Sequence, residues 1–467
     1  MIGFVTCVNE SDRDKAYCIS AVENGAPIVI KSASALALRP GECVEVSGSD
    51  ISECTAPAEN IASLLSNAIG AASEKLQHQN PYSIGIRAID EATERMWPNL
   101  LAASKLLLRK LFLSAPIIIR FHNDCDGSSG ACSLHIALSE ISSVIGSGSD
   151  PSWIMHRGIS YRTEDAESDT LMLNSFSSYE KPLIIIIDFG TSNESNHGIK
   201  SLGDSVDIIW LDHHPLQDGA ECQKLQHYIN PWQFSGDSNY TAGTLASVFA
   251  STLSKEDFNE YIYASMIGDY SDYKTEYDEA SATSAILDML TSDPRIIGSS
   301  DRISPKELLK ALSGKKREEL LNFANVTMSE AMDTALKLSK RYGTESGPAI
   351  YVLDFEKVRT DSKYPLPGRF SSKLLEKLAA NEPHGTIVIV HAGLYISVRS
   401  SVSSKELSIK DAMEKLVENK KESVESYGGH EYASSIKVRE KESKADVIAA
   451  LVNYIREMGS GRSSAAV

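Results

Sequence analysis

The chain has 467 residues, of which 42% are hydrophobic and 23% charged, and its formal net charge is −17. This length predicts two or three domains, and the composition is that of a folded globular protein, which excludes a disordered chain. The negative charge excludes a protein covered in basic surface for bulk nucleic-acid binding. It leaves room for a narrow basic groove, or for a metal site that supplies positive charge locally.

The cysteines and the apolar runs indicate the compartment. The seven cysteines are scattered and include no C-x-x-C pair, so we expect reduced thiols rather than a disulfide framework or a structural zinc site. No run of about 18 apolar residues occurs, and the first residues lack the basic-then-apolar pattern of a signal peptide. We therefore expect a cytoplasmic protein with no membrane partner.

The pattern of apolar residues divides the chain into five regions. Short apolar stretches separated by turn residues predict a small β domain over 1–55, and helical spacing predicts a helical linker region over 56–114. Over 115–300, strands alternate with helices, and runs such as "PLIIII" fit strands buried on both faces. This predicts an α/β domain with a doubly wound parallel sheet. A charged helical connector over 301–345 precedes a smaller mixed α/β C-terminal domain over 346–457.

Polar residues follow three successive predicted strands, at the point where each apolar run stops. "PIIIRF" is followed by "HNDCDG", "PLIIII" by "DFG", and "VDIIWL" by "DHH". In the first of these, Gly127 is expected to make a tight turn into a helix, and a fourth stretch, "MIGDYSDY", ends a predicted helix. In open α/β sheets ligands bind beyond the carboxyl ends of the strands, so these side chains are candidates for one site. They are His122, Asp124, Asp126, Asp188, Asp212, His213, His214, Asp269 and Asp272.

Each of these residues alone has an ordinary structural explanation, because Asp commonly forms turns and caps helices. Together, about five neighbouring carboxylates would repel and raise one another's pKa values, and divalent cations remove that conflict. Mixed carboxylate and imidazole ligands suit manganese, with magnesium, zinc and iron less specifically indicated. The Asp124-x-Asp126 spacing can serve two ions with Asp188 between them. Two ions roughly 3.5–4 Å apart are the arrangement for phosphoryl displacement, which predicts phosphoester hydrolysis.

The four motifs, in this order, resemble those of the DHH phosphoesterase superfamily. The region "GRFSSKL … ISVRSS … YGGHEYASSIKV" looks like the DHH-associated C-terminal domain, although the family usually continues the Gly-Gly-His loop with Ala-Ala-Gly. The form of the first motif is most similar to archaeal RecJ-like exonucleases of the GINS-associated nuclease type. The resemblance implies a DHH domain and a C-terminal substrate-binding domain that face each other across a cleft.

The resemblance also implies roles for individual residues. Two manganese ions, with magnesium as the alternative, would be bound by His122, Asp124, Asp126, Asp188, His213 and Asp269, and Asp188 would bridge them. Asp212 would either bind metal or orient His213, and His214 would face the scissile phosphate. Asp272 is the alternative to Asp269 as the fourth-motif ligand. In the C-terminal domain, the substrate would be bound by Arg399 and Ser400 together and by Gly428, Gly429 and His430.

The leading hypothesis for function is a manganese-dependent exonuclease specific for single-stranded DNA or RNA. We expect it to run from 5′ to 3′ and to act in DNA replication or repair. A second hypothesis is a phosphoesterase for very short oligonucleotides. A third is a replisome scaffold whose catalysis is dispensable and which binds a GINS-type partner and the replicative helicase.

Overall fold

The computed structural model describes residues 2–460 in part, and His430, predicted to bind substrate, lies outside the described residues. The chain divides into two compact units, Met1–Arg317 and Glu318–Val467, which are considered separately below. The division falls inside the predicted connector 301–345. Within 2–460, the residues not described are 11–14, 22–26, 33–37, 40, 48–49, 56, 77–79, 146–149, 159, 177–179, 191, 217–218, 275–277, 301, 343–346, 359–361, 404–406 and 430–431.

The first unit begins with a five-stranded antiparallel sheet, which confirms the predicted N-terminal β segment. Its strand order is β3-β2-β1-β4-β5, and its core contains Val5, Ile19, Val44 and Ile51. The last strand was not predicted, because it is four residues long and buries only Ile51. The strands are β1 (Ile2–Glu10), β2 (Lys15–Ala21), β3 (Pro27–Ser32), β4 (Cys43–Ser47) and β5 (Asp50–Glu53).

The centre of the first unit is a five-stranded parallel sheet, and this confirms the α/β fold predicted from the apolar runs. The strand order is β10-β9-β8-β6-β7, and every neighbouring pair is parallel. The three central strands were predicted, whereas the edge strands β7 and β10 were missed because they are short and carry no long apolar run. The strands are β6 (Ile117–His122), β7 (Ser152–His156), β8 (Leu183–Ile187), β9 (Asp207–Leu211) and β10 (His227–Ile229).

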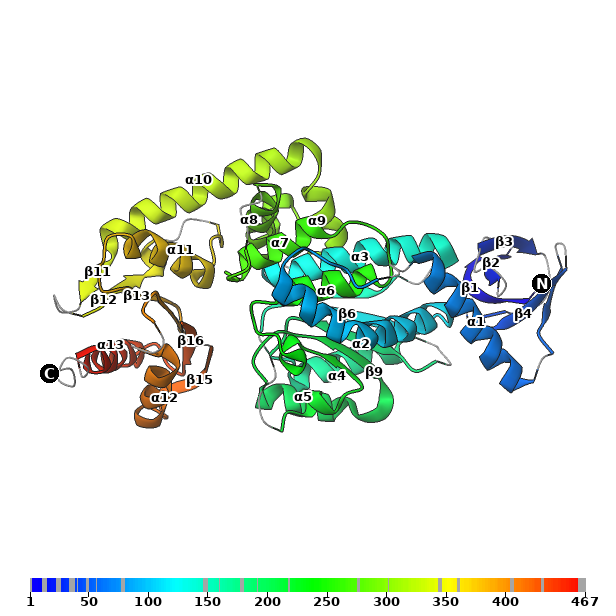
Figure 1. Ribbon diagram of the computed structural model, residues 1–467, viewed down its shortest axis with the longest axis horizontal. Coiled ribbons are helices and arrows are strands. Elements are labelled where there is room, and N and C mark those ends of the chain that lie inside the picture. Colours follow the sequence, from blue (N-terminus) through cyan, green and yellow to red (C-terminus); the bar gives the residue numbers. More distant parts are fainter. Residues whose placement is uncertain are drawn as a thin grey trace. The chain divides into compact units, whose positions relative to one another are not determined.

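Helices cover both faces of this sheet, as its buried strands require. Side chains such as Ile184, Ile186 and Trp210 pack against α4 and α5 on one face. On the other face α3 and α6 pack together against the strands (Figure 1). The helices of the unit are α1 (Ala58–Leu76), α2 (Arg87–Phe112), α3 (Cys125–Ile145), α4 (Thr163–Asn174), α5 (Asn193–Leu202), α6 (Ala242–Ser251), α7 (Asn259–Gly268), α8 (Asp278–Ser292) and α9 (Pro305–Ala311). Its 3₁₀ turns are η1 (Gly203–Ser205), η2 (Glu221–Lys224), η3 (Pro231–Phe234) and η4 (Pro294–Ile297).

The second unit is a six-stranded mixed sheet, which confirms the predicted smaller α/β domain. Its order is β11-β12-β13-β14-β16-β15. Helices α12 and α13 cover one face through a core that includes Ile389, Ile396 and Leu451, and α11 packs on β13 and β14. The unit boundary lies in α10 (Gly314–Leu338). The other elements are β11 (Lys340–Tyr342), β12 (Ala349–Asp354), η5 (Phe355–Lys357), α11 (Pro367–Ala379), β13 (Thr386–Ala392), β14 (Tyr395–Ser400), α12 (Ile409–Asn419), β15 (Val424–Gly429), β16 (Ala433–Val438) and α13 (Lys444–Ser460).

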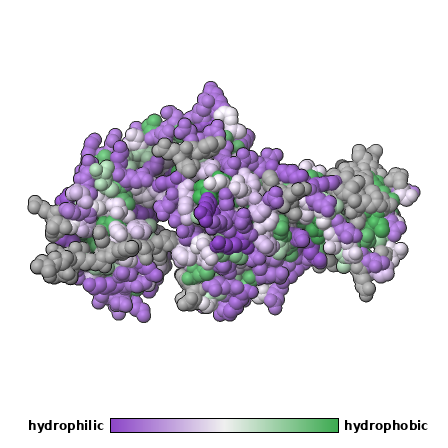
Figure 2. Space-filling view, in the orientation of Figure 1, coloured by the Kyte–Doolittle hydropathy of each residue, from purple (hydrophilic) through white to green (hydrophobic). Residues whose placement is uncertain are grey.

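The visible surface is mostly hydrophilic, with apolar residues scattered among polar ones (Figure 2). Among the residues that the structure describes, no helix is both long enough and apolar enough to cross a bilayer.

Candidate metal centre

The predicted site residues meet at the carboxyl edge of the parallel sheet. Phe121 pairs with Ile187, and Ile187 pairs with Leu211, so β6, β8 and β9 end side by side. The residues that follow these pairs are therefore neighbours in space although they are far apart in sequence. Three groups of side chains on this edge and the adjoining α3 and α7 each bring potential metal-ligating atoms within 4.8 Å of one another.

The first group consists of His122, Asp124 and Asp188. The Nδ1 atom of His122 lies 2.7 Å from Oδ2 of Asp124 and 3.3 Å from Oδ2 of Asp188. The second oxygen of Asp124, Oδ1, accepts a hydrogen bond from the Gly127 N–H at 3.0 Å, which ties the carboxylate to the start of α3. One imidazole and two carboxylates thus converge from two neighbouring strands.

The second group consists of Asp126, His213 and Asp269, and a third joins His213 with Asp188 and His214. The Nε2 atom of His213 lies 3.6 Å from Oδ2 of Asp126 and 3.6 Å from Oδ1 of Asp188. Because Oδ2 of Asp188 faces His122 while Oδ1 faces His213, this carboxylate lies between the first two groups. That arrangement fits the bridging role predicted for it.

Asp126 is held rigidly by a second helix. Its carboxylate accepts hydrogen bonds from the backbone N–H groups of Ala242 at 2.9 Å and Gly243 at 2.7 Å, at the start of α6, and from the Ser265 hydroxyl at 2.5 Å. A Cβ atom on Gly243 would lie 2.6 Å from the Asp126 carbonyl oxygen, so only glycine allows this approach. The N-terminus of α6 therefore stabilises the charge of Asp126 and fixes its direction.

The expected role of Gly127 is wrong in detail. Helix α3 starts at Cys125, so Gly127 lies in its first turn and does not make a tight turn ahead of the helix. A Cβ atom at this position would lie 2.6 Å from both the N and the O atom of His122. Glycine is required because the helix passes directly over the backbone at the end of β6.

Asp188 adopts a left-handed backbone conformation, with φ of 66°. Among residues with a Cβ atom, Asp and Asn tolerate this region best. Its N–H donates to the Leu211 carbonyl at 3.0 Å, and its side chain is buried. The turn after β8 thus directs the carboxylate inward between the groups from β6 and β9, and strain of this kind is typical of functional sites.

The ionisation of the site shows how strongly its charges are crowded. Burial raises the pKa of Asp126 well above its ordinary value, and the Asp188 and Asp269 carboxylates add to the effect. Burial, reinforced by Asp188, also raises the pKa of Asp269 to about 6, although this side chain lies at the rim and is 40% exposed. Without cations, these carboxylates would hold protons at pH values where an isolated carboxyl group is ionised.

Burial shifts the pKa of a histidine in the opposite direction from the pKa of a carboxyl group. Burial lowers the pKa of His213, but the Asp269, Asp126 and Asp188 carboxylates outweigh burial and raise it to about 10. The pKa of His122 is raised well above its ordinary value in the same way, by Asp124 and Asp188. Protons on these imidazoles thus neutralise the carboxylates, and divalent cations would compete with them for the same lone pairs.

The orientation of His213 provides an independent test of whether metal fits. Its Nδ1 atom lies 2.8 Å from the Ser238 carbonyl oxygen, which can only accept, so Nδ1 carries a hydrogen. In the neutral ring the lone pair of Nε2 then points at the carboxylates of Asp126 and Asp188. A lone pair facing two anions is repulsive unless a proton or a cation lies between them. The donor set therefore fits divalent cations, with an outer hydrogen bond that fixes the tautomer as in many metal sites.

Asp212 does not orient His213, contrary to one of the two roles predicted for it, and it belongs to none of the three groups. Its Oδ1 accepts from Nδ1 of His214 at 2.7 Å and from the His214 backbone N–H at 3.2 Å. The Tyr228 hydroxyl and the Asn230 amide donate to the other oxygen, at 3.3 and 3.4 Å. Burial lowers the pKa of His214, but the Asp212 carboxylate outweighs burial and raises it. Asp212 and His214 thus form a dyad in which a buried carboxylate holds an imidazole.

The geometry distinguishes Asp269 from Asp272. Asp269 ends α7 and joins Asp126 and His213 in the second group. Asp272 instead accepts from the Asn239 amide at 3.4 Å, and its own N–H donates to the Asn239 side chain at 2.8 Å. Asp272 therefore joins two loops, and of the two residues it is Asp269 whose carboxylate lies among the other potential metal ligands.

In the second unit, Arg399 and Ser400 lie on opposite faces of β14. Their side chains therefore do not point to one substrate group together, contrary to our expectation. The Ser400 hydroxyl is buried and accepts from the Val402 N–H at 3.0 Å. Arg399 points to the other face, where its Nε donates to the Ser372 hydroxyl of α11 at 3.1 Å. Gly428 and Gly429 lie within β15, opposite Ser435 and Ser434.

Sequence reasoning missed three residues around the site. His156 ends β7 beside His122, and its ring lies 5.0 Å from that of Phe189. Asn230 directly follows β10 and donates to both Asp212 and the His214 carbonyl. Ser238 lies in a loop and holds His213. His156 and Asn230 stand at the carboxyl ends of strands, as the predicted residues do, but these two strands were too short to be predicted.

Three comparisons place the chain among known proteins. No family model matches it. An uncharacterized protein of Methanocaldococcus jannaschii is 24% identical over 421 residues, which are 79% of this chain and 55% of the relative, so the chain spans about half the length of the curated relative that it matches. A solved structure described as the DHH domain of a member of the s1p family of ribosomal proteins superimposes with a TM-score of 0.69 at 20% identity, covering 86% of this chain and 99% of that one. RecJ from Thermus thermophilus, in complex with Mn²⁺, gives 0.49 at 14% identity, covering 79% and 60%.

Proposed function

We propose that this chain, which has the fold of a DHH-domain protein, is a phosphoesterase that depends on divalent cations. One observation carries the proposal. Donor atoms of six side chains converge in two groups with Asp188 between them, next to an Asp212–His214 dyad whose imidazole lies in the third group, with Asp188 and His213. Carboxylate-rich paired sites suit phosphate chemistry, because phosphate brings negative charge that only cations can offset in such an acidic environment.

The protein side chains have separable tasks in this proposal. His122, Asp124 and Asp188 would hold one cation, and Asp126, His213 and Asp269 would hold the other. Divalent cations bound by these residues would supply Lewis-acid activation of the phosphate and of an attacking water.

In this proposal the Asp212–His214 dyad supplies the proton for the leaving oxygen of the phosphoester. Because Nδ1 of His214 donates to Asp212, Nε2 is the nitrogen that exchanges a proton with the substrate. The raised pKa of His214 favours the protonated ring, which can donate to the leaving oxygen.

We assign the substrate as single-stranded DNA or RNA, cleaved exonucleolytically from the 5′ end in DNA replication or repair, with manganese as the preferred ion and the cytoplasm as the location. The order of the four motifs and the DHH-like C-terminal region support this assignment. Arg399 provides a guanidinium for phosphate in the second unit. Gly428 and Gly429, with His430, allow backbone N–H groups to approach the substrate. A GINS-type protein is the partner that we propose.

The test is a product time course on 5′-labelled and 3′-labelled DNA and RNA oligonucleotides, long and very short, with Mn²⁺ or Mg²⁺. Stepwise shortening from the 5′ end of long strands is the expected result. Cleavage of only the shortest oligomers would instead show an enzyme for very short oligonucleotides. No cleavage with either metal would refute the proposed nuclease activity, and a binding assay with GINS would then address the scaffold hypothesis.

A further inference from the structure

An exposed tryptophan lies beside the proposed catalytic centre. Trp232 belongs to η3, which follows β10, and β10 pairs with β9, the strand that precedes the Asp212–His214 dyad. The Asp212 N–H donates to the Ile229 carbonyl at 3.2 Å, so the ends of the two strands are joined directly. Trp232 is 41% exposed, whereas Trp97 and Trp210 are buried.

The polar end of the Trp232 ring is attached to the backbone of the centre. Its Nε1–H lies 3.2 Å from the His213 carbonyl oxygen and 3.1 Å from the Ser238 hydroxyl. That hydroxyl donates to the same His213 carbonyl at 2.8 Å, and the Ser238 carbonyl accepts from the His213 ring. Ser238 therefore holds both rings: its hydroxyl contacts the Trp232 indole, and its carbonyl oxygen accepts from the His213 imidazole.

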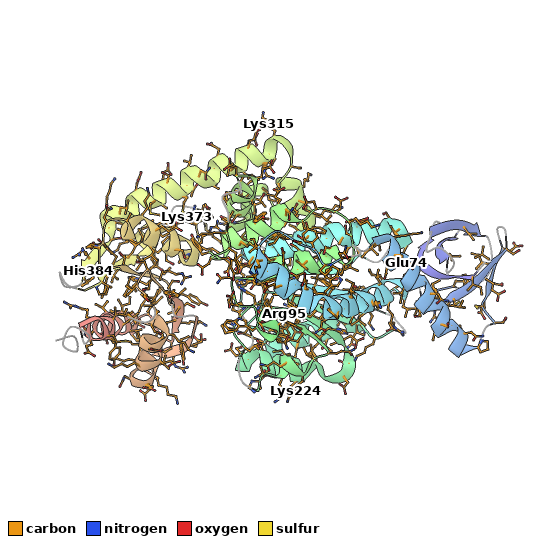
Figure 3. All side chains as sticks on the ribbon, viewed as in Figure 1. Glu74, Arg95, Lys224, Lys315, Lys373 and His384 are labelled. Carbon is orange, nitrogen blue, oxygen red and sulfur yellow. The ribbon has the colours of Figure 1, made fainter. Side chains whose placement is uncertain are left out.

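The segment that carries the ring is fixed at both ends. At its start, the Asn230 side chain accepts from the Trp232 N–H at 3.0 Å and donates to the His214 carbonyl at 3.0 Å. At its end, Arg95 of α2 donates from Nη1 to the Phe234 carbonyl at 3.1 Å; Arg95 is labelled in Figure 3. Since these contacts join η3 to three other parts of the unit, the ring has a set position relative to His213 and His214.

The Trp232 indole is exposed yet held in place, which distinguishes it from the single apolar residues scattered over a protein surface. Its single polar atom already has protein partners, so what it offers a ligand is an apolar π face. Such faces bind planar rings by stacking, and nucleobases stack on them with little regard to sequence. Inorganic phosphate and pyrophosphate have no ring to place there.

We propose that Trp232 is a stacking platform for a base of a single-stranded nucleic acid whose phosphodiester lies at the metal centre. This inference rests on the proposed function and adds a basis for selecting nucleic acids over ring-free phosphates. A base paired inside a duplex has both faces covered by its neighbours, whereas an unpaired base can leave its stack and cover the indole. The platform therefore also favours single strands.

The experiment compares Trp232→Phe with Trp232→Leu on two substrates. Both variants lose the Nε1–H donor, but only phenylalanine keeps a π face, so the difference between them isolates stacking. The substrates are a single-stranded oligonucleotide and an oligomer of equal length made of abasic units, both with Mn²⁺. We expect Trp232→Leu to raise the KM for the base-bearing oligomer roughly 5- to 100-fold, and Trp232→Phe to raise it much less. On the abasic oligomer the two variants should behave alike.

The controls separate the possible failures. Phe176→Ala removes an exposed aromatic ring, 52% exposed, that lies between α4 and β8 in the chain and in none of the three metal groups, and it should change neither KM. Equal losses by the Leu and Phe variants on both oligomers would show a purely structural role and overturn the inference, as would no loss at all. If the unmodified protein cleaves neither oligomer, the proposed function itself fails, and this inference fails with it.

Discussion

Asp212 and His214 are joined twice, through the His214 ring at 2.7 Å and through its backbone N–H at 3.2 Å, both to the same carboxylate oxygen. Asp212 is fully buried, whereas the His214 side chain is 32% exposed. A buried carboxylate that holds one nitrogen of a partly exposed imidazole sets the tautomer and directs the other nitrogen outward. The two histidines of "DHH" thus have different supports, because His213 is held by Ser238 instead.

The dyad predicts a loss of turnover without a loss of metal binding. His214→Gln should lower kcat about 10²- to 10⁴-fold, the range for removing a general acid, while the affinity for Mn²⁺ changes little. Asp212→Asn should lower kcat less, because the imidazole remains but its tautomer is no longer fixed. Rapid-quench kinetics and Mn²⁺ titration calorimetry measure the two effects. Asp272→Asn, an equal change of charge on a loop-fastening residue, should leave kcat unchanged.

Asp188→Asn should abolish metal-dependent hydrolysis while preserving the fold. Asparagine tolerates the left-handed backbone at this position, so the turn after β8 should survive. The loss of one carboxylate between two groups should lower activity at least about 100-fold, because metal activation is worth several kcal/mol. Activity with saturating Mn²⁺ and the urea midpoint are the measurements. Wild-type activity with a bound-metal stoichiometry of two would contradict the bridging role.

Metal binding should strengthen as pH rises and should release protons. Asp269, with a pKa raised to about 6, holds a proton below that pH, so affinity should fall as pH drops through 6. His213, with a pKa raised to about 10, is protonated at neutral pH and must lose its proton to bind a cation. Calorimetry of Mn²⁺ binding at pH 7 in buffers of different ionisation enthalpy should therefore detect proton release. An affinity independent of pH from 5 to 8 would rule out these ligands.

Two glycine substitutions should act in opposite directions. Gly127→Ala places a methyl group 2.6 Å from backbone atoms of His122, so it should destabilise the first unit by about 1–3 kcal/mol and displace the first metal group. Gly70→Ala, in the exposed middle of α1, meets nothing within 4 Å and should stabilise by up to about 1 kcal/mol through helix propensity. Urea denaturation of both variants provides the comparison.

The buried ion pair between Arg120 and Asp169 should contribute strongly to the free energy of unfolding. Arg120, on β6, donates from Nε and Nη2 to the two oxygens of Asp169 at 2.8 and 2.7 Å, and Asp169 is fully buried. Asp169→Asn leaves a buried guanidinium without its full counter-charge, which should cost about 3 kcal/mol of unfolding free energy. Glu91→Gln, which breaks the exposed pair with Arg87, should have no measurable effect on the same urea curve.

The sequence by itself determined the class of fold and most of the candidate site. Runs such as "PLIIII" predict strands that are buried on both faces, and parallel strands place whatever follows them at one edge. The local sequence determines where each strand ends, so this rule brings the residues after the strands together at one site. These residues are His122, Asp124, Asp126, Asp188 and His213.

Tertiary structure alone decided which partner each side chain has. Asp212 binds His214 through one oxygen, while its other oxygen accepts from Tyr228 of β10, a strand too short to be predicted, and from Asn230 directly after it. Ser400 turns away from Arg399 because alternate residues of a strand face opposite sides, and only the core shows which side is which. The support of Trp232 by His213 and Ser238 joins a 3₁₀ turn to two loop positions, and no local pattern encodes their proximity. Side-chain direction and loop contacts depend on packing between distant segments, and this is why the sequence located the site but did not assign its contacts.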